Sequence, residues 1–238
     1  MNLYVGTSGY SYKEWKGTFY PEKLTAKEML PYYATRLPAV EINNTFYRLP
    51  QKVVLENWKQ QVPLGFRFSV KAPQRITHFK RLKDADEVTG YFLETVAALE
   101  DRLGPILFQL PPNMKKDLER LKTFLTGLPS GTHSAFEFRH PTWFDDDVLE
   151  LLSKGNYALC ISDTDEMPVS HIDKTADWGY VRLRRVNYSE ESLREWIRRM
   201  REQNWQDSFV FFKHEDEGSG PKLAAEFMKL AEQTSATT

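Results

Sequence analysis

The sequence is poor in features that mark several classes of protein. It contains one cysteine, Cys160, among 238 residues, which excludes an internal disulfide and makes a cytoplasmic location the expectation. No stretch approaches the ~20 apolar residues that cross a bilayer. The first residues show no basic segment followed by an apolar run. The sequence therefore predicts neither a membrane span nor a signal peptide.

A strong net charge is also missing. With 32 basic and 33 acidic residues, the formal net charge is −1, which gives no long-range field to attract nucleic acid.

Known cofactor motifs are absent as well, since GTSGYSY lacks the G-x-G-x-x-G spacing and no Walker loop or G-x-S-x-G elbow occurs. Histidines are scattered, and no ligand set has a recognised metal spacing. The sequence thus names no cofactor and predicts no metal site.

What the chain does contain is typical of a globular protein. Apolar residues make up 41%, charged residues 27% and aromatic residues 13% of the sequence. The length suits one large α/β barrel or two small domains. No linker or change in composition divides the chain, so we expect one domain over residues 1–238.

A short apolar strand, a polar loop and an amphipathic helix recur along the chain. In residues 65–71, for example, Phe66, Phe68 and Val70 alternate with polar residues, which is the period of a strand. Eight such units predict a parallel sheet closed into a (β/α)8 barrel of the TIM type. An open, doubly wound sheet is the alternative. The expected strands are residues 3–8, 39–43, 65–71, 105–110, 134–139, 157–162, 178–183 and 208–213.

Apolar stripes at spacings of three and four predict helices between these strands. One stripe occupies residues 88–103 and meets Gly104, where we expect the helix to stop. Ser189 can cap the helix after the seventh strand, and Pro221 suits the first turn of the last helix. Residues 162–177 show no such stripe, so one of the eight helices is either missing there or replaced by a loop.

In a parallel barrel, the loops that follow the strands converge on one mouth, which carries function. Here the residues at these positions are unusually polar and carry charges of both signs. Because unpaired buried charge is costly, these groups need either one another or a ligand. The candidate catalytic residues are Glu41, Lys71, His78 and Glu137. The candidate substrate-binding residues are Ser8, Tyr10, Asn43, Gln109, Arg139, Arg182, Lys213, Gly218 and Gly220.

Glu41 and Glu137 stand in strands that are otherwise apolar. A carboxylate near a lysine or arginine can be a general base or a ligand anchor. It can equally form an ion pair that ties neighbouring strands together, and the residues leave both interpretations open. Lys71 and Lys213 add the option of an imine-forming amine, although lysines flanked by carboxylates more often bind anions.

A glycine-rich segment follows the eighth predicted strand. Gly218, Ser219 and Gly220 lead into the last helix, where barrels often hold a phosphate with backbone N–H groups and the helix dipole. Arg182 on the seventh strand adds a guanidinium, whereas Arg185 should lie on the opposite side of that strand. We therefore predict an anion site here, on condition that the acidic residues 215–217 turn outward. A flexible glycine turn is the alternative.

Six segments follow one another along the chain, namely GTSGYSYKEWKGTFYP, EINNTFYRLP, FRFSVKAPQRITHFKRL, FQLPP, FEFRHPTWF and YVRLR. In this order they resemble the YecE-like proteins, which are grouped as domain of unknown function 72. The resemblance covers almost the whole chain and implies a TIM-type barrel without an established activity. It also adds Tyr47 and Trp143 to the candidate substrate-binding residues. Many members carry an asparagine pair after the last strand, where this chain has Lys213 and His214, so a role of that loop does not carry over.

Three functions fit these observations. The first is an enzyme that uses acid–base groups on a small polar substrate, phosphorylated or sugar-like. The second is a nucleic-acid-binding or processing barrel, in which arginines of the mouth hold phosphates and aromatic residues stack bases. The near-zero net charge disfavours it. The third is a ligand-binding protein without catalysis. The sequence leaves open whether the chain is an enzyme, which substrate it takes and how it oligomerises.

Overall fold

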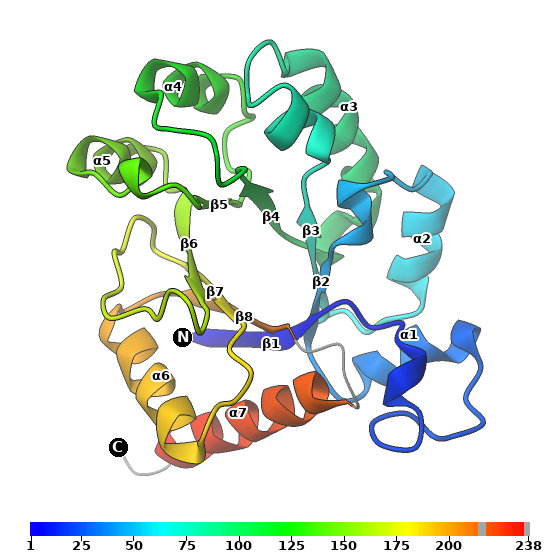
Figure 1. The fold of residues 1–238 in the computed structure, drawn as a ribbon. Coiled ribbons are helices and arrows are strands. Elements are labelled where there is room, and N and C mark those ends of the chain that lie inside the picture. The colour runs from blue at the N-terminus through cyan, green and yellow to red at the C-terminus, as the bar shows by residue number, and fades with distance from the viewer. Residues whose placement is uncertain (214–217, 236–238) are drawn as a thin grey trace.

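Eight parallel strands form a closed barrel in the computed structural model, which describes residues 1–213 and 218–235 (Figure 1). Each strand pairs with the next along the chain, and the last pairs with the first. The predicted TIM-type barrel is thereby confirmed. The strands are β1 (Asn2–Ser8), β2 (Ala39–Ile42), β3 (Arg67–Lys71), β4 (Leu103–Gln109), β5 (Ser134–Glu137), β6 (Ala158–Asp163), β7 (Gly179–Leu183) and β8 (Asp207–Phe212).

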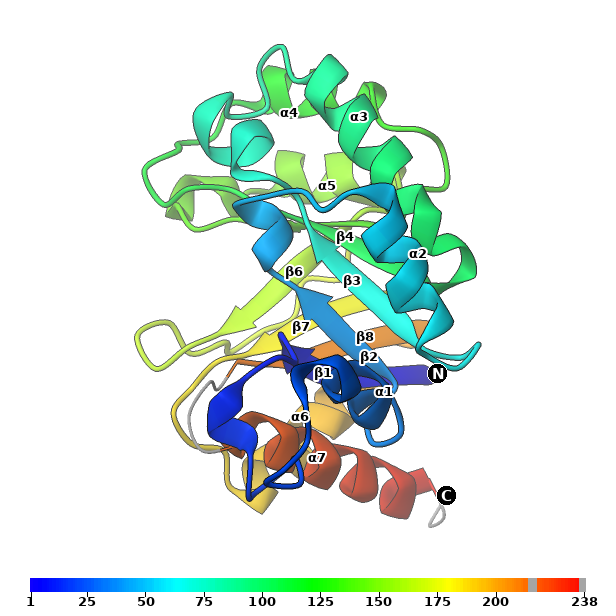
Figure 2. The ribbon, with the colours of Figure 1, turned by 90° about the vertical axis from the view of Figure 1, so that its right-hand side faces the viewer.

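Helices cover the outside of the barrel (Figures 1 and 2). The α-helices are α1 (Met29–Ala34), α2 (Lys52–Gln60), α3 (Asp86–Val96), α4 (Leu118–Thr126), α5 (Asp146–Lys154), α6 (Glu190–Glu202) and α7 (Ser219–Ser235). Short 3-10 helices occupy Lys13–Trp15, Ala26–Glu28, Asn44–Phe46, Ala97–Arg102 and Pro141–Trp143, and a π-helical turn occupies Arg75–Phe79. Within the described ranges, no helix is long and apolar enough to cross a membrane.

The connection between β6 and β7 runs as a loop over residues 164–178, as the missing apolar stripe indicated. The predicted ends of two helices are also confirmed. Ser189 caps α6, since its hydroxyl accepts a hydrogen bond of 3.2 Å from the backbone N–H of Ser192. Pro221 lies in the first turn of α7.

Gly104 does not stop a helix, and that prediction is wrong. The chain leaves the helical conformation earlier, at Glu100, whose φ is 49°. Gly104 lies inside β4, where a Cβ atom would come within 3.2 Å of the carbonyl oxygen of Phe68. Glycine at this position therefore allows β4 to pass close to the neighbouring strand.

The barrel interior is filled by apolar side chains over most of its depth. Inward positions alternate along each strand, and several carry alanine beside bulky rings. Tyr4 stacks on Phe209 at 4.7 Å between ring centroids, and Tyr180 packs against Phe211 at 5.3 Å. A polar layer replaces the apolar residues at the carboxyl ends of the strands. Six residues predicted to share one end do so, namely Glu41, Lys71, Gln109, Glu137, Arg182 and Lys213.

Candidate functional site

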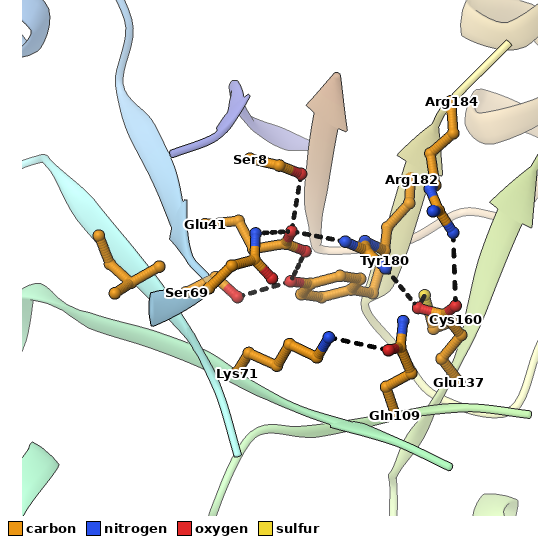
Figure 3. A network of polar contacts seen from close by, with 12 residues as sticks. Ser8, Glu41, Ser69, Lys71, Gln109, Glu137, Cys160, Tyr180, Arg182 and Arg184 are labelled. Carbon is orange, nitrogen blue, oxygen red and sulfur yellow. Dashed lines mark hydrogen bonds and ion pairs between the residues drawn. The ribbon is translucent and has the colours of Figure 1, made fainter. Parts of the chain in front are cut away.

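Arg182 lies between two buried carboxylates in the mouth of the barrel (Figure 3). Its Nη2 atom is 2.9 Å from Oε1 of Glu41, and its Nη1 atom is 2.6 Å from Oε2 of Glu137. The three side chains are at most 3% exposed. Because Glu41 comes from β2, Glu137 from β5 and Arg182 from β7, this pair of ion pairs joins three separate parts of the barrel wall.

Glu41 accepts further hydrogen bonds that hold it in the ionised form. Ser8 donates to Oε1 at 2.7 Å, Asn43 donates to the same atom at 2.9 Å, and the Tyr180 hydroxyl donates to Oε2 at 2.7 Å. Burial alone would raise the pKa of Glu41, but Arg182 and these donors outweigh burial and lower it. Glu41 is therefore a buried anion that accepts from three donors at Oε1 and one at Oε2.

Glu137 is surrounded by cations. Besides Arg182, the Nε atom of Arg139 is 3.1 Å from Oε1, and Nη1 of Arg184 is 3.8 Å from the same oxygen. Burial raises the pKa of Glu137, but Arg182 and Arg139 outweigh it and lower the pKa to about 2. The buried Cys160 thiol lies 4.0 Å from Oε2, and burial together with Glu137 raises its pKa. Glu137 is thus ionised, and Cys160 is a protonated thiol.

Lys71 has a pKa that lies closer to neutrality than that of an ordinary lysine. Its Nζ atom donates to Oε1 of Gln109 at 2.8 Å and lies 4.1 Å from the centroid of the Phe46 ring. Burial and Arg182 lower the pKa of Lys71 to about 8, against the opposing effects of Glu41 and Glu137. At pH 7, roughly a tenth of the molecules therefore hold Lys71 as a neutral amine.

His78 contacts the same aromatic ring, Phe46, as Lys71 does. Its ring packs edge-on against Phe46 at 4.8 Å, and its Nδ1 atom is 2.9 Å from the hydroxyl of Thr77. Burial lowers the pKa of His78 to about 4, with further contributions from Lys71 and Arg139. The imidazole is therefore neutral at physiological pH and can exchange hydrogen bonds, but it carries no charge.

Positive charge exceeds negative charge in this mouth. Arg182, Arg139, Arg184 and protonated Lys71 provide four cations against the carboxylates of Glu41 and Glu137. The excess lies on the open side, since the Arg139 and Arg184 side chains are 32% and 21% exposed, whereas Arg182 is 3% exposed. Such an arrangement can bind an anion. Among residues 1–213 and 218–235, no three carboxylate, imidazole or thiol groups are placed to hold a metal ion.

Three buried donors of the mouth make no hydrogen bond of ordinary length to the described residues. They are Nε2 of Gln109, Nε of Arg182 and Nε of Arg184. The Gln109 amide is close enough to Glu137 to help lower the pKa of that carboxyl. Its Nε2 group can nevertheless donate a further hydrogen bond. Buried donors without partners are uncommon and are often completed by water or a ligand.

Residues 4–238 match the family described as "Protein of unknown function DUF72". The chain belongs to this family. The resemblance inferred from the six sequence segments is thereby confirmed, and the family description states no activity.

Relatives agree with this assignment. The UPF0759 protein YecE of Escherichia coli K12 is 32% identical over 143 residues, which cover 60% of this chain and 50% of YecE. The chain thus spans about half the length of the curated relatives it matches first. The UPF0759 protein YunF of Bacillus subtilis is 22% identical over 96% of this chain and 94% of its own.

Solved structures of the family share the barrel. A DUF72 family protein of Thermotoga maritima has a TM-score of 0.85 and 29% identity, covering 98% of this chain and 100% of that one. A DUF72 family protein of Enterococcus faecalis has a TM-score of 0.76 and 20% identity, covering 97% and 98%. The second likeness is evidence of the fold alone. These names report neither a substrate nor a reaction.

In this DUF72 protein, eight of the predicted site residues meet in one network or directly beside it. They are Ser8, Glu41, Asn43, Lys71, Gln109, Glu137, Arg139 and Arg182. His78 joins them through Phe46. Most of the polar residues predicted at strand ends therefore lie close together in the fold, and their role in a functional site stays a prediction.

Three predicted binding residues lie apart from this network. Trp143 is 1% exposed, stacks on Phe138 at 4.6 Å and donates its Nε1 hydrogen to the carbonyl of Met114 at 2.7 Å, so its ring packs in the core. Tyr47 is 76% exposed on the loop after β2. Tyr10 lines a separate cavity of about 230 Å³ with Trp58.

Arg182 is not available for an anion at the glycine-rich segment of residues 218–220. Both terminal nitrogens of Arg182 are paired with carboxylates, as described above. Gly218 has a φ of +79° and lies against the first loop, where a Cβ atom would come within 2.6 Å of the Thr18 hydroxyl. Gly220 is buried in the first turn of α7, and Lys213 is exposed directly after β8. His214 and residues 215–217 lie outside the described residues, so an anion site here stays a prediction.

Arg185 lies on the other side of β7 from Arg182, as strand alternation predicted. Its Nη2 atom is 2.7 Å from Oδ1 of Asp163, which is fully buried. Arg185 is therefore part of a pair on the outer side of the barrel wall.

Two members of the network were missed in the sequence. Tyr180 bonds Glu41, and its hydroxyl also lies 2.7 Å from the hydroxyl of Ser69. A signal was available, because Tyr180 precedes Arg182 by two residues and Ser69 precedes Lys71 by two. Residues two apart in a strand point to the same face, so both belong to the inward set.

Proposed function

We propose that this DUF72 protein is a barrel enzyme that binds a small substrate bearing an anionic group, such as a phosphate, and transfers protons with Lys71. The excess of positive charge on the open side of the mouth carries this proposal. An anion between Lys71, Arg139 and Arg184 gains charge-assisted hydrogen bonds and reduces the repulsion among the cations. Because the cations converge on a barrel mouth instead of forming a stripe on the surface, they suit a small ligand better than a nucleic acid.

The titratable groups of the mouth have different roles in this proposal. A carboxylate with a pKa of about 2, such as Glu137, is a weak base at neutral pH. Glu41 and Glu137, which the sequence nominated as catalytic groups, therefore serve as positioning residues that fix Arg182 and Arg139. Lys71, with a pKa of about 8, can both lose and gain a proton near physiological pH. Neutral His78 supplies a hydrogen bond to the substrate.

Anion binding is tested by calorimetric titration with inorganic phosphate and simple sugar phosphates. We expect Arg139→Gln and Arg184→Gln each to weaken binding by about tenfold, since a hydrogen bond to a charged group contributes roughly 1.5–3 kcal/mol. Arg194→Gln is the control, because Arg194 pairs with Glu190 on the exposed side of α6. No binding by the wild type at tens of millimolar, or equal loss in the control, would overturn the proposal.

Proton transfer is tested separately, with the same sugar phosphates incubated in D2O and followed by NMR for exchange of carbon-bound hydrogen. Lys71→Arg keeps the positive charge, but arginine does not lose its proton in proteins. We expect this variant to retain anion binding and to lose exchange. Exchange at the wild-type rate in Lys71→Arg would remove Lys71 from the role of base.

A further inference from the structure

The barrel wall opens between the ends of β5 and β6. These strands pair only through Ala135 with Ala158 and Phe136 with Leu159. The neighbouring pairs β4–β5 and β6–β7 each pair over four positions. Beyond Leu159 the two strands diverge, so side chains from the inner and the outer face of the wall reach one common space.

A cavity of about 510 Å³ occupies this opening. Glu137 and Cys160 line it from the inner face of the wall, and Phe138, Leu159 and Ile161 line it from the outer face. A loop takes the place of a helix between β6 and β7 (Figure 1). Residues 164–173 of this loop line the opposite side of the cavity. The volume lies within the range of roughly 300–1,000 Å³ that is common for small-molecule pockets.

The loop that closes this cavity is held in place by a buried carboxylate. Asp163 accepts hydrogen bonds from the backbone N–H of Val169 at 2.9 Å and from the Tyr188 hydroxyl at 2.9 Å. It also pairs with Arg185 at 2.7 Å, and its own exposure is 0%. Val169 lines the cavity, so its wall is fixed by the fold and does not require a ligand to form.

The two ends of the cavity differ in chemistry. Arg139 and Arg184 line it where it meets the mouth, and burial together with Arg182 lowers the pKa of Arg184. Nine of the other lining residues, Cys160 included, are apolar, whereas the polar ones are Glu137, Ser162, Thr164, Ser170, His171 and Asp173. Phe144 and Met167 also line it, and they are 47% and 57% exposed. A ligand that covers them would remove apolar surface from water.

From this geometry we infer that the substrate is an amphipathic anion. Its phosphate or carboxylate lies between Arg139 and Arg184, and an aromatic or branched aliphatic group fills the cavity between β5 and β6. The inference rests on the proposed function for the anionic group, and it adds the apolar group and its place. Hydroxyl-rich sugars alone do not match a wall made of Phe138, Leu159 and Ile161.

The experiment compares matched anions with and without a ring: inorganic phosphate with phenyl phosphate, and acetate with phenylacetate. We expect the ring to tighten binding to the wild type by about tenfold or more in at least one pair, as burial of apolar surface predicts. The two pairs also distinguish a phosphate from a carboxylate as the preferred anion. Phe144→Ala and Met167→Ala remove apolar surface from the lining, so each should reduce the gain and leave the affinity for the ringless anion unaltered.

Tyr91→Ala is the matched control, because Tyr91 is a 64% exposed ring on α3 that does not line the cavity. If phosphate or acetate binds and the ring adds nothing, the apolar subsite is wrong while the proposed anion site stands. If the gain from the ring is undiminished in both cavity variants, the ring binds elsewhere and the inference is wrong as well. If no anion binds the wild type, both proposals are overturned together.

Discussion

The Nη1 atom of Arg182 lies 2.6 Å from Oε2 of Glu137, and neither side chain exposes more than 3% of its surface. A charge pair buried this deeply costs desolvation, which good geometry and further hydrogen bonds must offset. Both partners have such additional bonds, Arg182 to Glu41 and Glu137 to Arg139. Removal of one partner is therefore expected to lower the free energy of unfolding by more than the pair itself contributes to it, because the other charge stays buried and unpaired.

Glu137→Gln is expected to destabilise the protein by about 3–5 kcal/mol, as for other buried pairs that lose one partner. The substitution preserves shape but leaves Arg182, Arg139 and Arg184 together without their shared carboxylate. Chemical denaturation measures the change. Glu190→Gln, which breaks an exposed pair with Arg194, is the control and should have a small effect. A loss below about 1 kcal/mol would show that the pair does not support the fold.

The acid sensitivity of the protein should depend on the same carboxyl. The pKa of Glu137 is about 2 in the folded protein, below the value of ~4.3 for an unfolded chain. The contribution of ionised Glu137 to the free energy of unfolding is therefore complete above about pH 4.3, and it is lost as the pH falls through 2. We expect the difference in unfolding free energy between wild type and Glu137→Gln to shrink from pH 5 towards pH 2. A constant difference over that range would contradict the lowered pKa.

Most of the fold could be predicted because its signals are local and repeat. Alternation identified strands such as Arg67–Lys71, and the absence of an apolar stripe identified the loop over residues 164–178. The end of α3 could not be placed in this way. Its apolar stripe continues through the 3-10 helix Ala97–Arg102, and only the close approach of β4 to β3 explains Gly104.

The candidate site was predictable in membership but not in pairing. Polarity at strand ends selected Glu41, Glu137 and Arg182, yet it could not show that the arginine bridges two strands that are far apart in sequence. The family resemblance selected Trp143, whose ring turns into the core, because position in the chain does not reveal the direction of a side chain after the strand has ended. The cavity between β5 and β6 depends on a loss of strand pairing that no local pattern encodes.

Tyr180→Phe tests a residue that sequence reasoning missed. The substitution removes the hydroxyl that donates to Glu41 and contacts Ser69, each at 2.7 Å, and leaves a buried carboxylate oxygen without that donor. A hydrogen bond to a charged group contributes roughly 1.5–3 kcal/mol, so a loss of this size is expected in chemical denaturation. Tyr157→Phe, which removes a half-buried hydroxyl bonded to the Leu125 carbonyl at 3.2 Å, should cost less. Equal losses in the two variants would mean that the charged partner adds nothing.

The reactivity of Lys71 should reveal its lowered pKa directly. Burial and Arg182 lower that pKa to about 8, so the neutral, nucleophilic amine becomes the majority above pH 8. In contrast, Lys116 is held by Asp145 and Asp147, which raise its pKa. Labelling with acetic anhydride at a series of pH values, read by mass spectrometry of peptides, should give half-maximal reaction of Lys71 near pH 8 and of Lys116 at higher pH.

An anion bound between Lys71 and Arg139 stabilises the protonated amine, so inorganic phosphate at saturating concentration should move the Lys71 midpoint upward and leave Lys116 unchanged. A Lys71 midpoint at or above that of Lys116 would contradict the assignment of Lys71 as the proton-transfer group.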